Sequence, residues 1–315
     1  MAIYLSDFLP DTDDYSLRQV VARGLDKGEE NRHPFQLIES ENISRLLKPR
    51  LPFSHKGTYG HALIIAGSPE TMGAALISAK ACVHAGAGLT SLSIPESGLI
   101  ALNTSIPEVM YLDRAKLGQD LFEFKKYQAI AIGPGLGTDQ KGLLKEVLAS
   151  GQQIVADADA LNMLADQPKL LQQLSKNSIL TPHMKEFDSL FGQHKTWWDR
   201  LQTAISKAKE YEIVIVLKNE RTFVIDQKGV VFINPTGNPA MAQGGMGDAL
   251  TGIITAFVAQ GYGAKTAAIL GVYFHGKSGD ELAKNSNSVT ASDVALQLSM
   301  TIKHHPLPSS APLSE

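Results

Sequence analysis

From residue 61 onward, short apolar runs alternate with segments that have a helical pattern. The runs HALIIAG, LTSLSI, YQAIAIG, QQIVADAD and SILTPH each lead into a loop, and most of these loops are rich in Gly, Asp or His. Uninterrupted apolar runs of this length are typical of strands buried on both faces. Strands that alternate with helices form mostly parallel sheets. We therefore expect an α/β fold with a mostly parallel central sheet flanked by helices on both faces.

The C-terminal part of the chain breaks this alternation. The segments IVIVLKNERTFVID and GVVFIN have the composition of strands, and the short links between them favour antiparallel pairing. The link KNERT, residues 218–222, is expected to be a tight turn with either an exposed tip or a nucleotide contact. Three helical patterns then follow, at residues 247–260, 265–284 and 290–303.

Three parts are expected along the chain. Residues 1–55 are polar and punctuated by proline, and we predict an N-terminal extension that packs on the main domain or on a neighbouring subunit. Within it, residues 16–23 have the pattern of a short helix. Residues 56–303 are expected to form one catalytic domain, and residues 304–315 a disordered tail.

Composition excludes several classes of protein. The net charge is −3 with no basic surplus, which argues against a nucleic-acid partner. Cys82 is the only cysteine, so neither an internal disulfide nor a cysteine zinc cluster can form. The longest apolar stretch, residues 249–264, contains Gln260 and several glycines and is too short to span a bilayer. The acidic N-terminus lacks the features of a signal peptide, so we expect a cytoplasmic protein without membrane contact.

A glycine-rich turn precedes the first of the C-terminal helices. Gly244, Gly245 and Gly247 crowd in front of Asp248, and the apolar helical pattern begins at once. A helix N-terminus presents free N–H groups and binds anions, and glycine lets a phosphate approach the backbone closely. Asp248 then has two possible roles, as an N-terminal helix charge or as a general base beside a phosphoryl group.

Two glycine patterns do not match their familiar motifs. GPGLGTD, residues 133–139, has the spacing G-x-G-x-G and so differs from the dinucleotide fingerprint; it is either a plain strand-to-helix turn or a close approach to a ligand. Residues 271–278 match the P-loop pattern, but a P-loop must leave a strand and enter a helix. This match lies inside a helical pattern, so we do not interpret it as a phosphate loop.

Carboxylates follow two of the predicted strands. Asp157 and Asp159 lie in DADALN, and Glu186 lies in TPHMKE together with His183. Carboxylates at strand ends can hold Mg²⁺, directly or through water. The alternative is helix N-capping by Asp159 and a solvated Glu186. His183 has no metal-ligand partner at useful spacing, so zinc is not expected.

Six motifs occur together in a specific order and spacing. They are SHKGTYGHALIIAGS (54–68), GPGLGTD (133–139), VADADALN (155–162), TPHMKEF (181–187), LKNERT (217–222) and NPAMAQGGMGDALTG (238–252). The ordered set resembles the ADP- or ATP-dependent NAD(P)H-hydrate dehydratases, a branch of the ribokinase-like superfamily. The resemblance covers residues 50–303 approximately, and it implies a ribokinase-like fold.

The resemblance implies a metabolite-repair reaction. The S-form of NADH or NADPH hydrate would be returned to NADH or NADPH by phosphorylation of the ring hydroxyl and elimination of phosphate, driven by ADP or ATP with Mg²⁺. Asp248 would accept the hydroxyl proton. The N–H groups of Gly245, Met246 and Gly247 would stabilise the charge that develops on the phosphoryl group.

The resemblance also assigns binding residues. The hydrate would lie near Ala74, Gly137, His183 and Asp248. The adenine nucleotide would lie near Lys218, Asn219, Glu220, Arg221, Thr222 and Gly247. Glu186 and Asp157 occupy the places where ribokinase-like enzymes organise Mg²⁺. A homo-oligomer, specifically a tetramer, is expected. The first 50 or so residues are too few for the family's epimerase module, so that partner is expected on a separate chain.

The sequence departs from the family pattern at three places. Met246 replaces the usual Thr or Ser, Met184–Lys185 replaces Pro-Gly, and Asn219–Glu220 replaces Gly-Ala. Two alternative functions stay open, and the first of them would use the same aspartate and anion-binding turn. One is a ribokinase-like kinase that phosphorylates a small alcohol such as a vitamin precursor, and the other is an inactive nucleotide-binding or regulatory protein.

Overall fold

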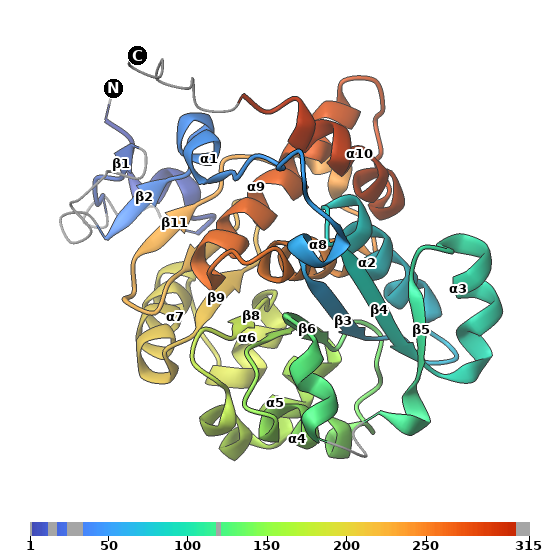
Figure 1. Cartoon of the computed structure of the whole chain (residues 1–315). Coiled ribbons are helices and arrows are strands. Elements are labelled where there is room, and N and C mark those ends of the chain that lie inside the picture. Colours follow the sequence, from blue (N-terminus) through green and yellow to red (C-terminus); the bar gives the residue numbers. More distant parts are fainter. Residues whose placement is uncertain (1, 12–17, 24–33, 118–120, 307–315) are drawn as a thin grey trace, which may run out of the picture.

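The computed structural model describes residues 2–11, 18–23, 34–117 and 121–306, and it forms a single large sheet covered by helices (Figure 1). The strand order is β1-β2-β11-β10-β9-β8-β7-β6-β3-β4-β5. The strands are β1 (Ala22–Arg23), β2 (Phe35–Leu37), β3 (His61–Ile65), β4 (Leu89–Ile94), β5 (Met110–Asp113), β6 (Ala129–Ile132), β7 (Ile154–Ala156), β8 (Ile179–Leu180), β9 (Val214–Leu217), β10 (Phe223–Ile225) and β11 (Val231–Ile233).

Neighbouring strands pair in parallel except at β10, which is antiparallel to both β9 and β11. The mostly parallel sheet predicted from the apolar runs is therefore confirmed, and so is the antiparallel pairing predicted from the short links. The turn between β9 and β10 consists of residues 218–222, as expected.

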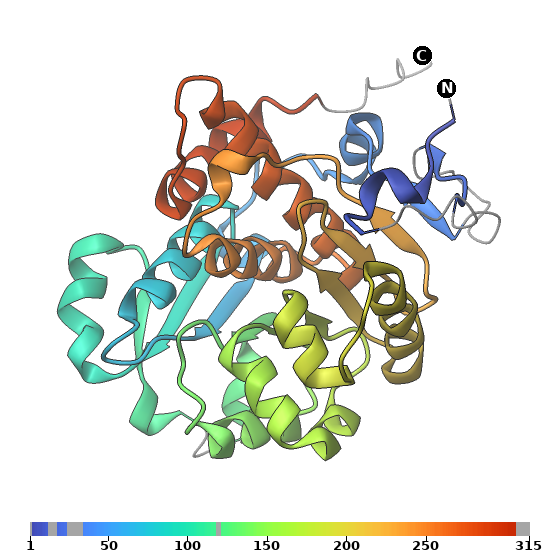
Figure 2. The same ribbon diagram turned by 180° about the vertical axis from the view of Figure 1, so that it is seen from behind.

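Helices cover both faces of the sheet (Figures 1 and 2). One face carries α1 (Ser40–Leu46), α2 (Met72–His84), α8 (Met246–Ala259), α9 (Ala264–Ala283) and α10 (Ala291–Lys303). The other carries α4 (Lys141–Ala149), α5 (Asp159–Asp166), α6 (Met184–Phe191) and α7 (Trp197–Tyr211). Helix α3 (Leu99–Ser105) links β4 to β5 and contributes Leu102 to the first of these cores.

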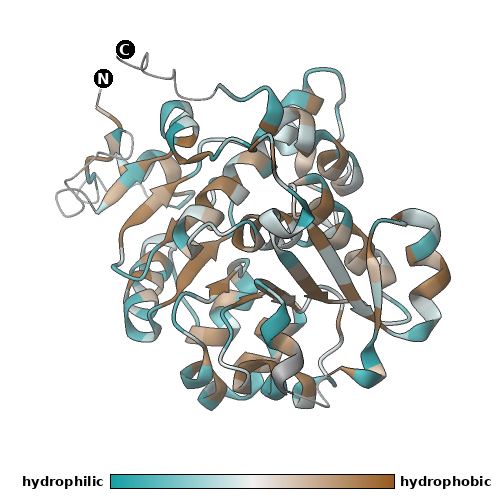
Figure 3. Ribbon diagram, viewed as in Figure 1, coloured by the Kyte–Doolittle hydropathy of each residue, from teal (hydrophilic) through white to brown (hydrophobic). Residues whose placement is uncertain are grey.

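Alternate residues along the strands divide the interior into two cores. In β3, Ala62 and Ile64 face the core beneath α2 and α8, whereas Leu63 and Ile65 face the core on the opposite side. This period of two follows from the pleat of a strand. Figure 3 shows the strands coloured mainly as apolar residues, with hydrophilic residues gathered on loops and outer helix surfaces. Within the described ranges, no helix is long and apolar enough to cross a membrane.

Helices α2 and α8 pack closely because a glycine lies between them. A Cβ atom added at Gly252 would lie 2.0 Å from the carbonyl oxygen of Ser78. The hydroxyl of Ser78 in turn donates a hydrogen bond to the carbonyl oxygen of Asp248 at 2.9 Å. The first turn of α8 is therefore held against α2.

The expected helix at residues 16–23 is wrong over the part that the structure describes. Residues 12–17 lie outside the described residues. Val20 forms an antiparallel bridge with Tyr4, and Ala22–Arg23 form strand β1 beside β2. Backbone pairing with neighbouring strands has overridden a weak local helical pattern. The expected disordered tail lies outside the described residues from residue 307 onward, whereas His305 is buried against Tyr273 and Phe274.

Candidate active site

The carboxyl ends of the parallel strands bring the site loops together beside the N-terminus of α8. This helix begins at Met246, and Gly245 precedes it in a left-handed conformation with φ of 87°. Because Gly245 has no side chain to cap the helix, the N–H groups of the first turn are free of a side-chain cap. Asp248 lies in this first turn. The turn has the geometry of an anion site with a carboxylate beside it.

A buried network of charged side chains lies beneath this turn. Asp157 follows β7, is 1% exposed, and accepts hydrogen bonds from Lys218 Nζ at 2.8 Å and Thr251 Oγ1 at 2.7 Å. Lys218 Nζ also lies 3.8 Å from Glu186 Oε2. The ends of β7 and β9 and the first turns of α6 and α8 thus contribute to one cluster, which contains Asp157, Lys218, Glu186 and Asp248.

The cluster changes the acidity of Asp248. Burial and the nearby Asp157 raise the pKa of the Asp248 carboxyl to about 6, while Lys218 acts in the opposite direction. Burial also raises the pKa of Glu186, and Lys218 opposes that shift. A carboxylate with a pKa of about 6 is ionised at neutral pH and is still basic enough to accept a proton.

The raised pKa of Asp248 predicts a pH-dependent cost to stability. Its ordinary pKa is 3.8, so the folded protein binds its proton more tightly than the unfolded chain does. The contribution of Asp248 to the free energy of unfolding should therefore fall by roughly 2 to 3 kcal/mol as pH rises from about 4 to about 6. Asp248→Asn should avoid this loss and be more stable than wild type above pH 6, with equal stability below pH 4. Urea denaturation at several pH values measures this, and a difference independent of pH would contradict it.

His183 and Glu186 form a reciprocal cap at the start of α6. The His183 N–H donates to Glu186 Oε2 at 2.8 Å, and the Glu186 N–H donates to His183 Nδ1 at 3.2 Å. Glu186 is 8% exposed, so the alternative of a solvated side chain is wrong. The His183 ring is half exposed at the end of β8, where it can contact a ligand.

Gly137 is held by a neighbouring loop. Its N–H donates to Asp159 Oδ2 at 2.8 Å, and its φ is 87°. The alternative of N-capping by Asp159 is wrong, because Ala158 is the N-cap residue of α5. Ala158 has φ of 47° and ψ of −116°, an uncommon backbone conformation for a residue with a side chain. The bend directs Asp157 into the buried network and Asp159 towards Gly137. Ala74, the remaining predicted substrate contact, lies in the first turn of α2, half buried.

A cavity of about 650 Å³ adjoins the anion-binding turn. All five residues of the predicted nucleotide segment line it, together with Gly247. Met246, whose N–H was predicted to bind the phosphoryl group, also lines it, but the sequence did not predict the other lining residues: Asn234, Thr236, Gly237, Asn238, Pro239, Met241, Ala242, Leu250, Val272, His275 and Gly276. Several of these residues lie in the stretch NPTGNPAM, whose density of Asn, Pro and Gly was the available signal for a ligand loop.

His275 lies in this cavity and within the discarded P-loop match. The match, residues 271–278, falls inside α9, so it is not a phosphate loop. The Nε2 atom of His275 is buried and has no hydrogen-bond partner among the described residues. Burial lowers the pKa of His275 to about 4, with a smaller contribution from Lys218, so the ring is neutral at pH 7.

The predicted Mg²⁺ ligands differ in how well they suit a metal. Both oxygens of the Asp157 carboxylate already accept hydrogen bonds, one of them from an ammonium group. Among the described residues, no group of three or more His, Cys, Asp or Glu side chains could hold a metal ion. Within the described part of the chain, the ion-pair contact of Glu186 Oε1 is with His183 Nε2, at 3.4 Å. Glu186 therefore fits an Mg²⁺ that brings other ligands with it, and Asp157 does not fit direct coordination.

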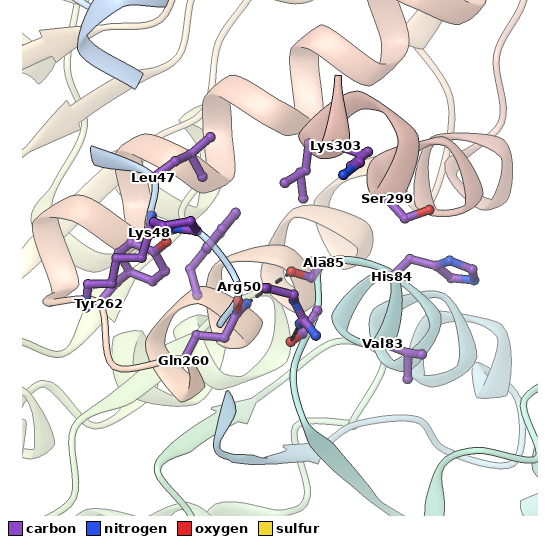
Figure 4. Close-up of a pocket in the computed structure, with 14 residues that line it drawn as sticks. Leu47, Lys48, Arg50, Val83, His84, Ala85, Gln260, Tyr262, Ser299 and Lys303 are labelled. Atoms are coloured by element: carbon purple, nitrogen blue, oxygen red, sulfur yellow. Dashed lines mark hydrogen bonds between the residues drawn. The ribbon is translucent and has the colours of Figure 1, made fainter. Parts of the chain in front are cut away.

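A second cavity, of about 570 Å³, lies at the other end of α8 (Figure 4). Lys48 donates to the Gly261 carbonyl at 3.1 Å, and Arg50 donates to the Gly86 carbonyl. These carbonyls lie just beyond the C-terminal ends of α8 and α2, where cations are favourable. Gln260 at this cavity is 12 residues from Asp248, or roughly 18 Å along a helix. The second cavity is thus separate from the cluster around Asp248.

Comparisons with known proteins match most of the chain to one family. A family model described as NAD(P)H-hydrate dehydratase matches residues 62–303. An ADP-dependent (S)-NAD(P)H-hydrate dehydratase from Lactiplantibacillus plantarum is 37% identical over 254 residues, which cover 79% of this chain and 90% of that protein. A bifunctional NAD(P)H-hydrate repair enzyme from Moorella thermoacetica is 39% identical over 276 residues, covering 80% of this chain and 52% of that protein. The chain thus spans about half the length of the bifunctional relative.

Solved structures give the same result. The ADP/ATP-dependent NAD(P)H-hydrate dehydratase from Bacillus subtilis, co-crystallised with ATP and Mg²⁺, matches with a TM-score of 0.77 and 32% identity, covering 85% of this chain and 98% of that one. A ribokinase-like superfamily protein from Enterococcus faecalis matches with a TM-score of 0.78 and 27% identity, covering 89% and 100%. The predicted ribokinase-like fold is confirmed, and the chain belongs to the NAD(P)H-hydrate dehydratase family.

Proposed function

We propose that this protein dehydrates the S-form of NADH or NADPH hydrate, using ADP or ATP to phosphorylate the ring hydroxyl before phosphate is eliminated. One observation carries the proposal beyond family membership. Asp248, with a pKa of about 6, lies in the first turn of α8, next to Gly247, which belongs to the anion-binding turn and lines the 650 Å³ cavity. A base, a phosphoryl site and a nucleotide-sized cavity are therefore contiguous.

The positions of these groups support the following reaction. Asp248 accepts the proton of the ring hydroxyl as its oxygen attacks the terminal phosphoryl group, and the bond to the rest of the nucleotide breaks. The N–H groups of Gly245, Met246 and Gly247 stabilise the charge on the phosphoryl oxygens. The ring nitrogen then donates electrons as the carbon–oxygen bond breaks, phosphate leaves, and loss of a ring proton restores the double bond.

Substrate and nucleotide occupy opposite sides of Asp248 in this proposal. Ala74, Gly137 and His183 follow β3, β6 and β8, and they would contact the hydrate. Lys218–Thr222 and Gly247 would contact the nucleotide. Bound Mg²⁺ would neutralise phosphate charge, and Glu186 is our proposed protein ligand for it, directly or through water.

The most direct test is recovery of the reduced cofactor. Chemically hydrated NADH or NADPH is incubated with the protein, Mg²⁺ and either ADP or ATP, and the absorbance of the reduced nicotinamide ring is followed. We expect absorbance to return only when nucleotide is present, with release of one phosphate for each cofactor recovered. A stable phosphorylated small molecule without recovery of absorbance would instead indicate the kinase alternative.

We also propose the assembly and cellular setting that are expected from the sequence. These are a homo-oligomer, specifically a tetramer, in the cytoplasm, with the epimerase on a separate chain. Exposed apolar side chains support self-association: Leu51 and Phe53 lie in one loop, and Leu296 and Met300 lie one turn apart on α10. The division into an extension (residues 1–55), a catalytic domain (56–303) and a tail (304–315) remains our prediction.

A further inference from the structure

The buried network beneath the anion-binding turn contains more than the proposed reaction uses. Thr251 is fully buried and lies one turn after Asp248 on the same helix. Its hydroxyl donates to Asp157, which in turn accepts from Lys218. These three hydrogen-bonded residues thus lie just after β7, just after β9 and on α8. Neither Thr251 nor Asp157 lines the cavity that the nucleotide would occupy.

The hydrogen bonds from Thr251 through Asp157 hold the Lys218 ammonium close to the anion-binding turn. A Cβ atom added at Gly247 would lie 3.2 Å from Lys218 Nζ, so the ammonium lies against the backbone of the anion-binding turn. The backbone of Lys218 is also fixed, because its N–H donates to the Pro182 carbonyl at 2.9 Å. A positive charge at this place attracts the anion that the free N–H groups would bind.

The Asp157 carboxylate already binds this ammonium group. Its carboxylate is 1% exposed and has one donor on each oxygen. An Mg²⁺ ion coordinated by Asp157 would lie about 2.1 Å from a carboxylate oxygen, and hence roughly 4 to 5 Å from the ammonium. Repulsion between the two cations and the removal of buried hydrogen bonds both oppose such binding.

We propose that Asp157, oriented by Thr251, holds the Lys218 ammonium beneath the anion-binding turn as a fixed positive charge, so that Asp157 is a counter-ion and not an Mg²⁺ ligand. The inference rests on the proposed function only in taking the bound anion to be a nucleotide phosphate. Asp157 and Thr251 act through Lys218 and are therefore positioning residues.

The chain offers a matched pair of threonines for the test. Thr251 and Thr255 are both fully buried on α8, but among the described residues the Thr255 hydroxyl donates only to the Thr251 carbonyl of its own helix. Thr251→Val removes the hydroxyl at constant shape, Thr251→Ser retains it, and Thr255→Val controls for loss of a buried hydroxyl. Asp157→Asn and Lys218→Met complete the set. Thr251→Val keeps the test decisive if Asp157→Asn fails to fold.

The first measurement uses Mg²⁺ alone. Lysine side chains are labelled with ¹³C at Cε, and the Lys218 resonance is assigned with Lys218→Met. We expect Thr251→Val to shift this resonance and Thr255→Val to leave it in place. Added Mg²⁺ should affect the resonance equally, or not at all, in wild type and Asp157→Asn. A shift caused by Mg²⁺ in wild type that Asp157→Asn abolishes would overturn the proposal.

The second measurement is ATP binding by calorimetry at several Mg²⁺ concentrations, without hydrate. We expect Thr251→Val to weaken binding about five- to tenfold, with Thr251→Ser and Thr255→Val within about twofold of wild type. Asp157→Asn should weaken binding at every Mg²⁺ concentration, and adding it to Lys218→Met should cause little further loss. Equal effects of the two valine variants, or independent effects of Asp157→Asn and Lys218→Met, would contradict the proposal. The calorimetry contains no hydrate, so it tests the role of Asp157 independently of the reaction. If the protein bound ATP as expected but did not dehydrate the hydrate in the absorbance assay, only the proposed function would be contradicted.

Discussion

Asp248→Asn is expected to lower the rate of hydrate dehydration by about 10³-fold or more, because the amide cannot accept the proton of the ring hydroxyl. Nucleotide affinity should stay within about threefold of wild type, since the backbone donors of the anion-binding turn remain. Single-turnover assays with hydrated NADH and nucleotide calorimetry measure the two effects separately. Activity with the wild-type enzyme should also rise as pH increases through about 6, as Asp248 ionises.

The matched control for this prediction is an aspartate outside the site. Asp166 ends α5 and forms an exposed ion pair with Lys141 at 2.8 Å. Asp166→Asn should therefore retain full activity. If Asp248→Asn kept more than about a tenth of the wild-type rate, a group other than Asp248 would have to be the base.

Gly252→Ala is expected to destabilise the fold by about 3 kcal/mol, the largest effect on stability that we predict. The added methyl would lie 2.0 Å from the Ser78 carbonyl, and backbone cannot move aside as a flexible side chain can. The higher helix propensity of alanine, worth about 1 kcal/mol, offsets only part of this cost. Separation of α2 from α8 would also disturb the Ser78–Asp248 hydrogen bond and lower activity.

Gly142→Ala provides the comparison, because Gly142 also lies inside a helix, α4, but has no atom within 4 Å of an added Cβ. That variant should be stabilised by up to about 1 kcal/mol. Urea denaturation of both variants measures the difference. Equal stability of the two would show that α2 and α8 can separate without cost.

The sequence predicted those parts of the fold that depend on local pattern. Apolar runs such as residues 61–65 and 129–132 could be predicted as strands, because a parallel strand buried on both faces is a continuous apolar run. The helix after Asp248 was predicted to within one residue at each end, because the glycine turn marks its start. Residues 35–37 were missed as a strand, because three residues are too few to show a period.

For the site too, features that depend on local sequence were predicted, and contacts between distant residues were not. The loops that carry Asp248, Gly137 and His183 were identified because glycine and polar residues follow apolar runs. The pairing of Asp157 with Lys218 and Thr251 was not predicted, because these residues are far apart in the sequence. Lys218 lies 61 positions after Asp157, and Thr251 lies 94 positions after it. Only the i, i+3 spacing of Asp248 and Thr251 hinted that both lie on one helix face. Only the three-dimensional structure shows that each carboxylate oxygen of Asp157 already accepts a hydrogen bond.

Strand β2 has a consequence for how the molecule behaves when its first residues are missing. It pairs in parallel with β11, and β1 covers it in turn with only two residues. Removal of residues 1–55 would leave the amide and carbonyl groups along one side of Val231–Ile233 without partners. An open strand of apolar residues is a template for pairing with another chain. Strand β2 therefore covers this edge of the sheet, and we expect a protein without it to pair with other molecules through β11.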